Sequence, residues 1–381
     1  MPAQVLRTLL ELDRKKFTFE STLNEGQKQL VSTVLAEGVL VLDRRTPVAK
    51  EILSGKEGEA EYFLSHTHKS LISEMEFILT THKRLLENPS AHMSFAMGVI
   101  LLTRGFYDDA ITQFQKVISL EPSHVPAIKH YGIALSLKGD FENARHIFQS
   151  LLDTVPGYAD IHYYLGNTYL FQRQFEKAKG CYKEALKINP AYAECHLRLA
   201  TCAVAVIAGD NASLVESAVQ GYADEAQRET QLALDANPRL MNGALLSGTA
   251  NLKQGKYQLA FKNYLEARPK YSPKLGSEMI YFYTLKLLYG EKGVSVNETE
   301  EYVRQLEGLV ESYPTYVDLR LHYSMGNLMK SNFLVHRSLR EVNKAIEVNP
   351  NFEKARSTAQ TLSEIYKKML AAVKNVYHSG S

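Results

Sequence analysis

Three histidines fall in the stretch SHTHKSLISEMEFILTTHK, and histidine is the side chain that most often binds a metal or moves a proton near neutral pH. His66 and His68 are two residues apart, and on a helix that spacing directs the two side chains to different sides. A zinc site needs several ligands that converge on one point, so this pair predicts a poor metal site. We therefore interpret His66, His68 and His82 as solvated histidines on the polar face of a helix.

The cysteines also offer little chemistry. Cys195 and Cys202 are seven residues apart, which places them two turns along one helix face, and small buried packing residues are a better interpretation than a redox or metal-binding pair. Cys181 is the third cysteine, and so small and odd a number argues against a disulfide framework. It favours a reducing compartment, so we expect a cytoplasmic protein.

Sequence motifs for catalysis are missing. The chain has no glycine-rich phosphate loop, no HExxH and no CxxC. The acidic run KEGEAEY, residues 56–62, is interpreted as a solvated helix start whose charges suit the helix dipole. We predict no catalytic residue, no cofactor and no metal, and a protein that is not an enzyme.

Composition narrows the classes of partner. The chain has 381 residues, of which 45% are hydrophobic, so it can bury a sizeable core. The net charge of +2 provides no broad basic surface for nucleic acid or an anionic membrane. No stretch approaches eighteen uncharged apolar residues, which predicts no integral membrane span, and Arg7, Glu11 and Asp13 interrupt the N-terminus where a secretion signal would need an apolar run.

The elements that would carry any function recur along the chain at a fixed spacing. A glycine, an alanine twelve residues later, an aromatic four further and a proline eight further recur in three successive registers: Gly98, Ala110, Phe114 and Pro122; Gly132, Ala144, Phe148 and Pro156; Gly166, Ala178, Tyr182 and Pro190. A period of about 34 residues is typical of stacked helix pairs. The small residues fit a close helix crossing, the aromatic fills the gap between repeats, and the proline ends the second helix.

This pattern resembles the tetratricopeptide repeat family. The resemblance is most specific over residues 91–192, has a fourth good match at Gly248, Ala260 and Tyr264, and weakens toward a last one at Gly326, Ala345 and Pro350. The motif's usual tryptophan is missing, because the chain contains none. The resemblance implies an all-α fold, a right-handed superhelical solenoid of antiparallel helix pairs over residues 91–350.

Insertions and flanks complete the expected organisation. Ala200 and Ala226 hold the places of the repeat's two small residues but lie more than twice as far apart, which predicts an insertion near 204–220 that forms a projecting helical hairpin. A second insertion near 290–298 is expected to be a loop. Residues 351–377 have an amphipathic period and predict a helix that caps the last repeat within a C-terminal segment of residues 351–381, with a dimerising helix as the alternative.

Residues 1–90 are expected to form a helical N-terminal region. Helix is predicted over residues 22–43, although GVLVLD alone could be a strand, and again over residues 59–87 with Pro89 as the terminator. Divergent repeats are the favoured interpretation of this region, and a separate small helical module is the alternative.

The family resemblance places a partner in the concave groove lined by the first helix of each pair. On the expected inner face, residues recur four apart and are largely apolar with a few polar points, so the predicted binding groove consists of Phe95, Val99, Lys129, Ile133, Tyr163, Asn167, Phe171 and Arg198. The side chains of Tyr163, Asn167 and Phe171 are expected to be at least partly exposed and to share one pocket with Lys129 and Arg198.

Some relatives in the family clamp the terminal carboxylate of a chaperone tail. Lys129 and Arg198 hold suitable places for that clamp, but Ile133, Tyr164 and Glu194 replace its other polar residues. An apolar or amphipathic ligand therefore suits this groove better than a chaperone tail.

The leading hypothesis is a non-enzymatic scaffold or adaptor that holds a peptide or an amphipathic helix of a protein partner. One alternative is a self-assembling protein, a homo-oligomer or coat, in which the groove takes the flank of a second copy. Another is an accessory subunit of a secretion, pilus or other macromolecular complex, or an enzyme subunit whose chemistry lies in residues 1–90.

Overall fold

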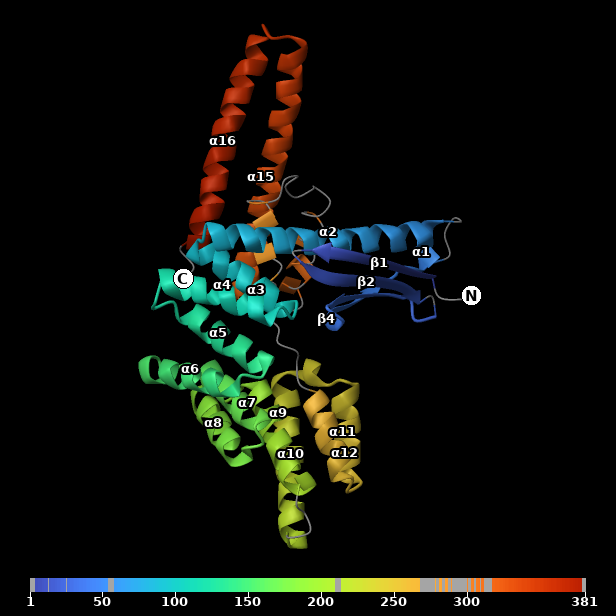
Figure 1. The fold of residues 1–381 in the computed structure, drawn as a ribbon, viewed down its shortest axis with the longest axis vertical. Helices are drawn as coiled ribbons and strands as arrows, with labels where there is room; N and C mark the ends of the chain where they lie inside the picture. The colour runs from blue at the N-terminus through green and yellow to red at the C-terminus, as the bar shows by residue number, and fades with distance from the viewer. Residues whose placement is uncertain are drawn as a thin grey trace. The chain divides into compact units, whose positions relative to one another are not determined.

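The computed structural model describes residues 4–12, 14–24, 26–53, 58–209, 214–267 and 317–378, together with scattered residues between 278 and 311. The chain divides into two compact units, one formed by Met1–His124 with Pro273–Ser381 and the other by Val125–Ser272. Helices dominate both units, and a small sheet begins the first (Figure 1).

The sheet is an antiparallel meander of β1 (Gln4–Leu12), β2 (Lys15–Asn24), β3 (Gln29–Ala36) and β4 (Val39–Pro47), hydrogen-bonded in the order β1-β2-β3-β4. Burial in β2 alternates residue by residue, with Phe17, Phe19, Ser21 and Leu23 facing inward. The helix predicted over residues 22–43 was wrong. The reason is that LVSTVLA is rich in β-branched residues and alternates with a period of two, which suits a half-buried strand.

One helix, α2 (Glu59–Glu87), packs on the sheet after the single turn α1 (Lys50–Leu53), and its predicted bounds are confirmed. Leu64 of α2 packs with Leu23, Leu30 and Val48 from the sheet side of this core. Residues 1–90 are therefore helical only in their second half.

The three histidines of α2 do not share one environment. His66 is exposed, as predicted, and its ring stacks on Tyr62, but His68 and His82 are buried. His68 lies between Thr8 and Ser21, with ring nitrogens 2.8 Å and 2.9 Å from the two hydroxyls. The prediction of solvated side chains was wrong for His68 and His82, because the helix face that carries them is covered by other elements of the first unit.

The first helix pair consists of α3 (Ala91–Thr103) and α4 (Tyr107–Leu120). The sheet packs on this pair, with Phe17 6.1 Å from Phe106 between ring centroids and Lys15 Nζ 2.8 Å from Asp109. A terminal repeat needs such a cover, because its outer apolar face has no neighbouring repeat.

The second unit is built from helix pairs: α5 (Val125–Lys138) with α6 (Phe141–Thr154), α7 (Ala159–Phe171) with α8 (Phe175–Ile188), α9 (Ala193–Gly209) with α10 (Glu216–Ala236), and α11 (Gly243–Lys253) with α12 (Tyr257–Glu266). A 3₁₀ turn, Pro238–Leu240, follows α10. The solenoid of helix pairs predicted from the repeat period is confirmed.

The predicted close crossings occur at the glycines. A Cβ on Gly166 would lie 2.5 Å from the ring of Tyr182, and Gly98, Gly132 and Gly248 face Phe114, Phe148 and Tyr264 in the same way. The pair α9 and α10 is longer than its neighbours, at 17 and 21 residues. The last pair packs on α9 through α12, so that Leu197, Val204 and Tyr264 belong to one core.

The C-terminal part of the first unit is a hairpin of two long helices, α15 (Val317–Val348) and α16 (Glu353–His378) (Figure 1). The amphipathic helix predicted over residues 351–377 is confirmed as α16. The prediction of a weak repeat at Gly326 and Ala345 was wrong, because both residues lie on the single helix α15. No glycine or proline between them ends that helix. The loop predicted near 290–298 lies outside the described residues.

Candidate interaction surfaces

The expected concave-groove residues lie on the first helices of the pairs, but most of their side chains are buried. In the first unit, Phe95 is 8% exposed and Val99 is 1% exposed. Phe95 packs between the rings of Phe114 and His124, at centroid distances of 6.0 Å and 5.2 Å. These two residues therefore pack helices and present little surface to a partner.

In the second unit, Tyr163 and Asn167 of α7 are 7% and 9% exposed. The Tyr182 hydroxyl donates a 2.9 Å hydrogen bond to Oδ1 of Asn167, so the amide is bonded inside its own helix pair. The exposure expected of Tyr163 and Asn167 was wrong. The reason is that tyrosine at position 182 is long enough to reach the amide across the crossing.

Arg198 of α9 is 2% exposed and lies beside Tyr163 and Tyr182. Ile133 of α5 is also buried. The structure thus brings Tyr163, Asn167 and Arg198 together, but in the interior rather than in an open pocket.

Two of the eight expected residues keep partly exposed side chains. Lys129 of α5 forms a 2.6 Å ion pair with Asp160 of α7, and Phe171 packs 5.9 Å from Phe141 between ring centroids. Lys129 is therefore already neutralised by an acid from the next helix pair.

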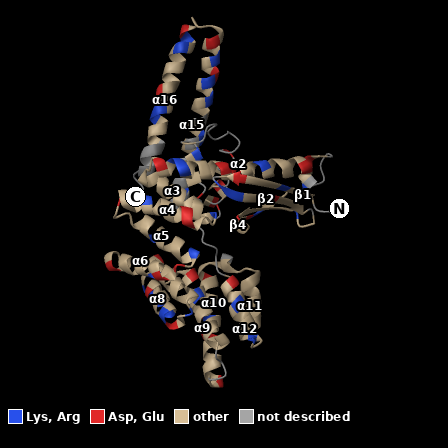
Figure 2. Ribbon diagram, in the orientation of Figure 1, with Lys and Arg blue, Asp and Glu red and all other residues tan. Residues whose placement is uncertain are grey.

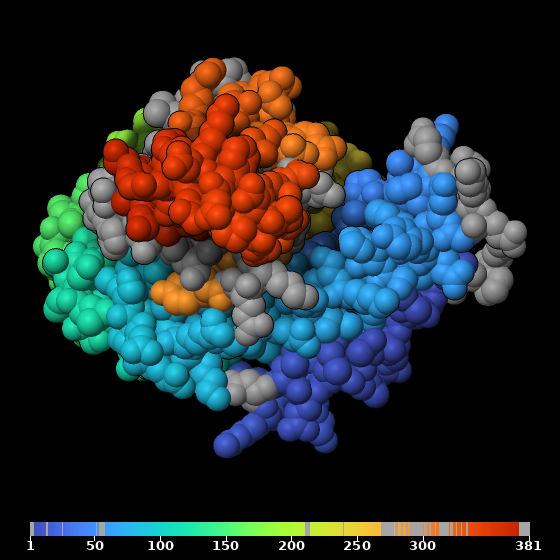
Figure 3. Space-filling model, turned by 90° about the horizontal axis from the view of Figure 1, so that it is seen from above, coloured from blue at the N-terminus to red at the C-terminus, as the bar shows by residue number. Residues whose placement is uncertain are grey.

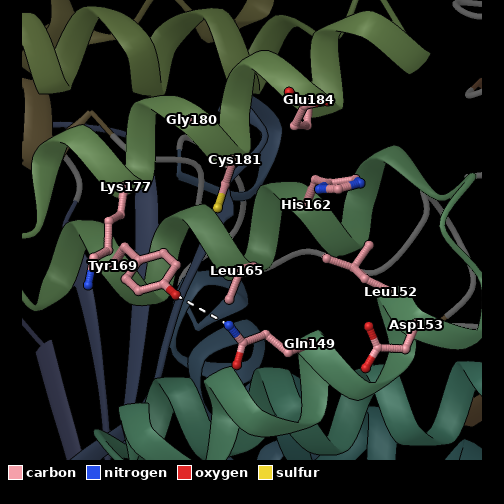
Figure 4. A pocket seen from close by; sticks show the side chains of 10 residues that line it. All are labelled: Gln149, Leu152, Asp153, His162, Leu165, Tyr169, Lys177, Gly180, Cys181 and Glu184. Atoms are coloured by element: carbon pink, nitrogen blue, oxygen red, sulfur yellow. Dashed lines mark hydrogen bonds between the residues drawn. The ribbon is translucent and has the colours of Figure 1, made fainter.

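An open groove lies elsewhere in this unit, between α6 and α8, with α7 as its floor (Figure 4). We call it the α6–α8 groove. It encloses about 690 Å³ and is lined by Gln149, Leu152, Asp153, His162, Leu165, Tyr169, Lys177, Gly180, Cys181 and Glu184. The middle of the floor is formed by Leu165 and Tyr169 (Figure 4), whose side chains are 5% and 8% exposed, so each offers only a small apolar surface to the groove.

The two ends of the α6–α8 groove carry opposite charges (Figure 4). Asp153 and Glu184 lie with His162 at one end, while Lys177 lies at the other, with its Nζ 5.6 Å from the centre of the Tyr169 ring. Gln149 donates a 3.5 Å hydrogen bond to the Tyr169 hydroxyl and fixes the ring at that end. The groove is thus polar at its ends and apolar between them, as small recognition sites commonly are.

Cys181 contributes bulk to the groove rather than reactivity. Burial raises the pKa of the Cys181 thiol to about 11, partly opposed by a backbone hydrogen bond and assisted by the charge of Glu184. The side chain is therefore a neutral thiol at physiological pH and a poor nucleophile. Burial likewise raises the pKa of the Cys202 thiol, to about 12. The packing role predicted for Cys195 and Cys202 fits their complete burial as free cysteines.

One residue of the α6–α8 groove, Gly180, is unusual in the sequence for its place in a helix, and the sequence-based predictions did not use it. Gly180 lies inside α8, where glycine costs about 1 kcal/mol of helix stability relative to alanine. Nothing lies within 4 Å of a Cβ built on it, so no close helix crossing explains it. The missing side chain at Gly180 leaves the α8 wall of the groove low at this point.

Acidic and basic residues are interspersed along the helices of each unit (Figure 2). None of the helices that the structure describes is both long and apolar enough to cross a bilayer. The described residues also contain no group of three or more histidine, cysteine, aspartate or glutamate side chains arranged to hold a metal ion.

These observations define a class, the helical repeat proteins built from stacked helix pairs. Two family models for the tetratricopeptide repeat match the chain, one over residues 95–159 and one over residues 159–192. Over residues 95–192 the chain therefore contains tetratricopeptide repeats, a type of module that mediates protein interaction.

Several solved structures are similar to parts of this chain. A MamA fragment from Desulfovibrio magneticus RS-1 is 20% identical, with a TM-score of 0.35, and the match covers 48% of this chain and 98% of that one. TTC0263, a TPR protein of Thermus thermophilus, is 19% identical with a TM-score of 0.33, covering 63% and 100%. YrrB, a TPR protein described as having an unusual peptide-binding site, is 17% identical with a TM-score of 0.32, covering 52% and 96%. No curated protein matches the chain.

Proposed function

We propose that this protein is a non-enzymatic scaffold that holds a segment of a partner protein in the α6–α8 groove. The observation that carries the proposal is the open groove itself, whose walls carry the exposed residues Asp153, Lys177 and Gly180 above a largely buried apolar floor. Of the eight residues first expected to bind a partner, Lys129 and Phe171 remain as secondary contacts because they are partly exposed.

The charges of the groove specify the chemistry of the bound segment. Asp153 is exposed at one end, where Glu184 on the opposite wall is already paired with Lys187 at 2.6 Å, and Lys177 is exposed at the other end. The complementary segment has apolar side chains in its middle, a lysine or arginine near Asp153 and an acidic residue near Lys177. Such pairs at the rim mainly set orientation and association rate, while the apolar anchors supply affinity.

The test uses a displayed library of random dodecapeptides, selected on the full-length protein and then measured by fluorescence polarisation. Gly180→Phe adds a bulky side chain to the lining of the groove at a position where nothing lies within 4 Å of the added Cβ. We expect this variant to bind the selected peptides with an affinity at least tenfold lower than that of the unaltered protein. Gly221→Phe is the matched control, because Gly221 is also helical, in α10, and equally open.

The composition of the selected peptides is a second readout. We expect them to combine apolar anchors with a basic residue and to lose affinity for Asp153→Lys. Peptides that bind Gly180→Phe as tightly as the unaltered protein would show that the binding surface lies elsewhere. In that case the partly exposed Lys129 and Phe171 become the surface to test.

A further inference from the structure

The sheet of residues 4–47 has two edges, and one of them is blocked. On the β4 side, the register shifts between Val34 and Leu35, and the strand ends at Pro47, which has no backbone N–H to donate. The turn at Gly105 also lies against this strand, since a Cβ on Gly105 would be 3.4 Å from the carbonyl oxygen of Val41. Irregularity, proline and a covering turn are devices that protect sheet edges from pairing.

The other edge, β1, lacks all three devices. Its nine residues pair with β2 in an uninterrupted register and include no proline. No strand in the described part of the chain pairs with its outer side. Leu9 is 71% exposed and Val5 is 51% exposed on this strand. Dark-blue atoms of the N-terminal sheet are visible at the surface in Figure 3. A regular edge with exposed apolar side chains favours pairing with another strand.

The backbone direction of β1 follows from a hydrogen bond on its neighbour. The carbonyl of Lys16 accepts a 2.9 Å bond from the N–H of Glu37, so this carbonyl points away from β1. Lys16 lies opposite Glu11, so these two residues form a non-hydrogen-bonded pair of the β1–β2 ladder. In such a pair the backbone N–H and C=O groups of both residues point away from each other, so those of Glu11 point to the open edge of the sheet. By alternation, Arg7, Leu9 and Glu11 each present an N–H and a C=O at the open edge.

We propose that β1 pairs antiparallel with β1 of a second copy of this chain, about a two-fold axis at Leu9. In that register Leu9 faces Leu9 of the second copy, and Arg7 faces Glu11 of the second copy in both directions. Twofold interfaces need a patch that is complementary to itself, and this strand meets that condition. The interface lies in the first unit and does not depend on the α6–α8 groove.

The charges of the neighbouring strand support this register. On the exposed face, β1 places Glu11 beside Lys16 and Arg7 beside Glu20 of β2. Across the joined sheet the row would read Lys16, Glu11, then Arg7 and Glu20 of the second copy, so the charges alternate in sign. An axis at Arg7 would instead oppose two arginines, and an axis at Glu11 two glutamates. Like charges directly opposite each other on neighbouring strands are destabilising.

The first experiment measures the mass of the full chain by sedimentation equilibrium over a range of concentrations. We expect a dimer for the unaltered protein and a monomer for both Arg7→Glu and Glu11→Arg, because each variant would oppose like charges twice in its own dimer. An equimolar mixture of the two variants should recover the dimer, since both pairs are then of opposite sign. This recovery also shows that the variants are folded.

Arg45→Glu is the matched control, because Arg45 is an exposed arginine on the blocked edge strand β4. It should leave the dimer intact. A monomeric unaltered protein at every concentration would overturn the proposal. So would a mixture that stays monomeric, or an Arg7→Glu variant that remains a dimer.

The second experiment tests the position of the axis. In a bonded antiparallel pair the two Cα atoms are about 5.5 Å apart, which is within the range of a disulfide. Leu9→Cys should therefore form a covalent dimer under mild oxidation, beyond any background from the native cysteines of the unaltered protein. Val39→Cys, on β4, should not, although Val39 is about as exposed as Leu9 at 66%. Equal cross-linking of the two variants would rule out pairing centred on Leu9.

Discussion

The phenolic hydroxyl of Tyr182 donates a hydrogen bond of 2.9 Å to the side-chain oxygen of Asn167, and both residues are buried. One repeat earlier, the same two places are held by Phe148 and Ile133. A polar pair in this repeat therefore takes the place of an apolar pair. This relationship explains why Asn167 is a packing residue and not a contact for a partner.

Tyr182→Phe should destabilise the protein, because it leaves the buried amide of Asn167 without its donor. An unsatisfied buried polar group costs about 1–3 kcal/mol. Urea unfolding followed by circular dichroism measures this loss. The double variant Tyr182→Phe with Asn167→Ile copies the preceding repeat and should recover most of the stability. A double variant as unstable as the single one would contradict the exchange of a polar for an apolar pair.

Two glycines in the same repeat should respond in opposite directions to alanine. A Cβ on Gly166 would lie 2.5 Å from the Tyr182 ring, so Gly166→Ala should overpack the crossing and cost about 1–3 kcal/mol. Gly180 has open space around it, so Gly180→Ala should stabilise α8 by about 0.5–1 kcal/mol. Thermal unfolding midpoints of the two variants check the signs, and equal shifts would show that the helix crossing is misplaced.

Glu74 of α2 joins the sheet to the first helix pair. Its carboxylate receives two hydrogen bonds from Arg44, at 2.8 Å and 2.9 Å, and one of 2.8 Å from Arg104. Burial alone would raise the pKa of this carboxyl, but Arg104 and Arg44 outweigh burial and hold the pKa below its ordinary value of 4.5. The charged form therefore stabilises the fold above that pH, and this contribution is lost as the pH falls through the lowered pKa.

Glu74→Gln should cost about 1.5–3 kcal/mol at pH 7, because Arg44 and Arg104 lose hydrogen bonds to a charged, partly buried carboxylate. The difference in unfolding free energy between this variant and the unaltered protein should shrink as the pH falls below 4.5. Urea titrations at a series of pH values measure it. Glu76→Gln, an exposed carboxylate on the same helix, is the control and should change little. A difference that does not vary with pH would contradict the charge pairing.

His68 should make the stability of the folded protein depend on pH in a higher range than Glu74 does. Burial between Thr8 and Ser21 lowers the pKa of His68 below its ordinary value of 6.5, so the folded protein keeps the ring neutral. The unfolded chain binds the proton more readily, and stability is therefore lost as the pH falls below 6.5. His68→Gln should remove this loss between pH 7 and the lowered pKa, whereas His66→Gln should not. Chemical denaturation midpoints across that range provide the measurement.

The sequence by itself determined the repeats, because their contacts are local. Gly166 and Tyr182 lie on consecutive helices and meet across one turn, so a fixed spacing of small and aromatic residues is sufficient to specify the crossing. The helix over residues 59–87 and the C-terminal amphipathic helix were predictable for a similar reason. In each, helix periodicity and a nearby proline act within a single segment.

Only the tertiary structure decided which faces of those helices are open. The burial of Asn167 depends on the length of Tyr182, and the burial of His68 depends on strands that lie far from it in the chain. The sheet was not predicted, because a segment of eight to ten residues with mixed polar and apolar positions is also compatible with a helix. Strand pairing depends on contacts between residues that are distant in the sequence, so a local pattern does not specify it. In this sheet it places Arg7, Leu9 and Glu11 on the edge strand β1.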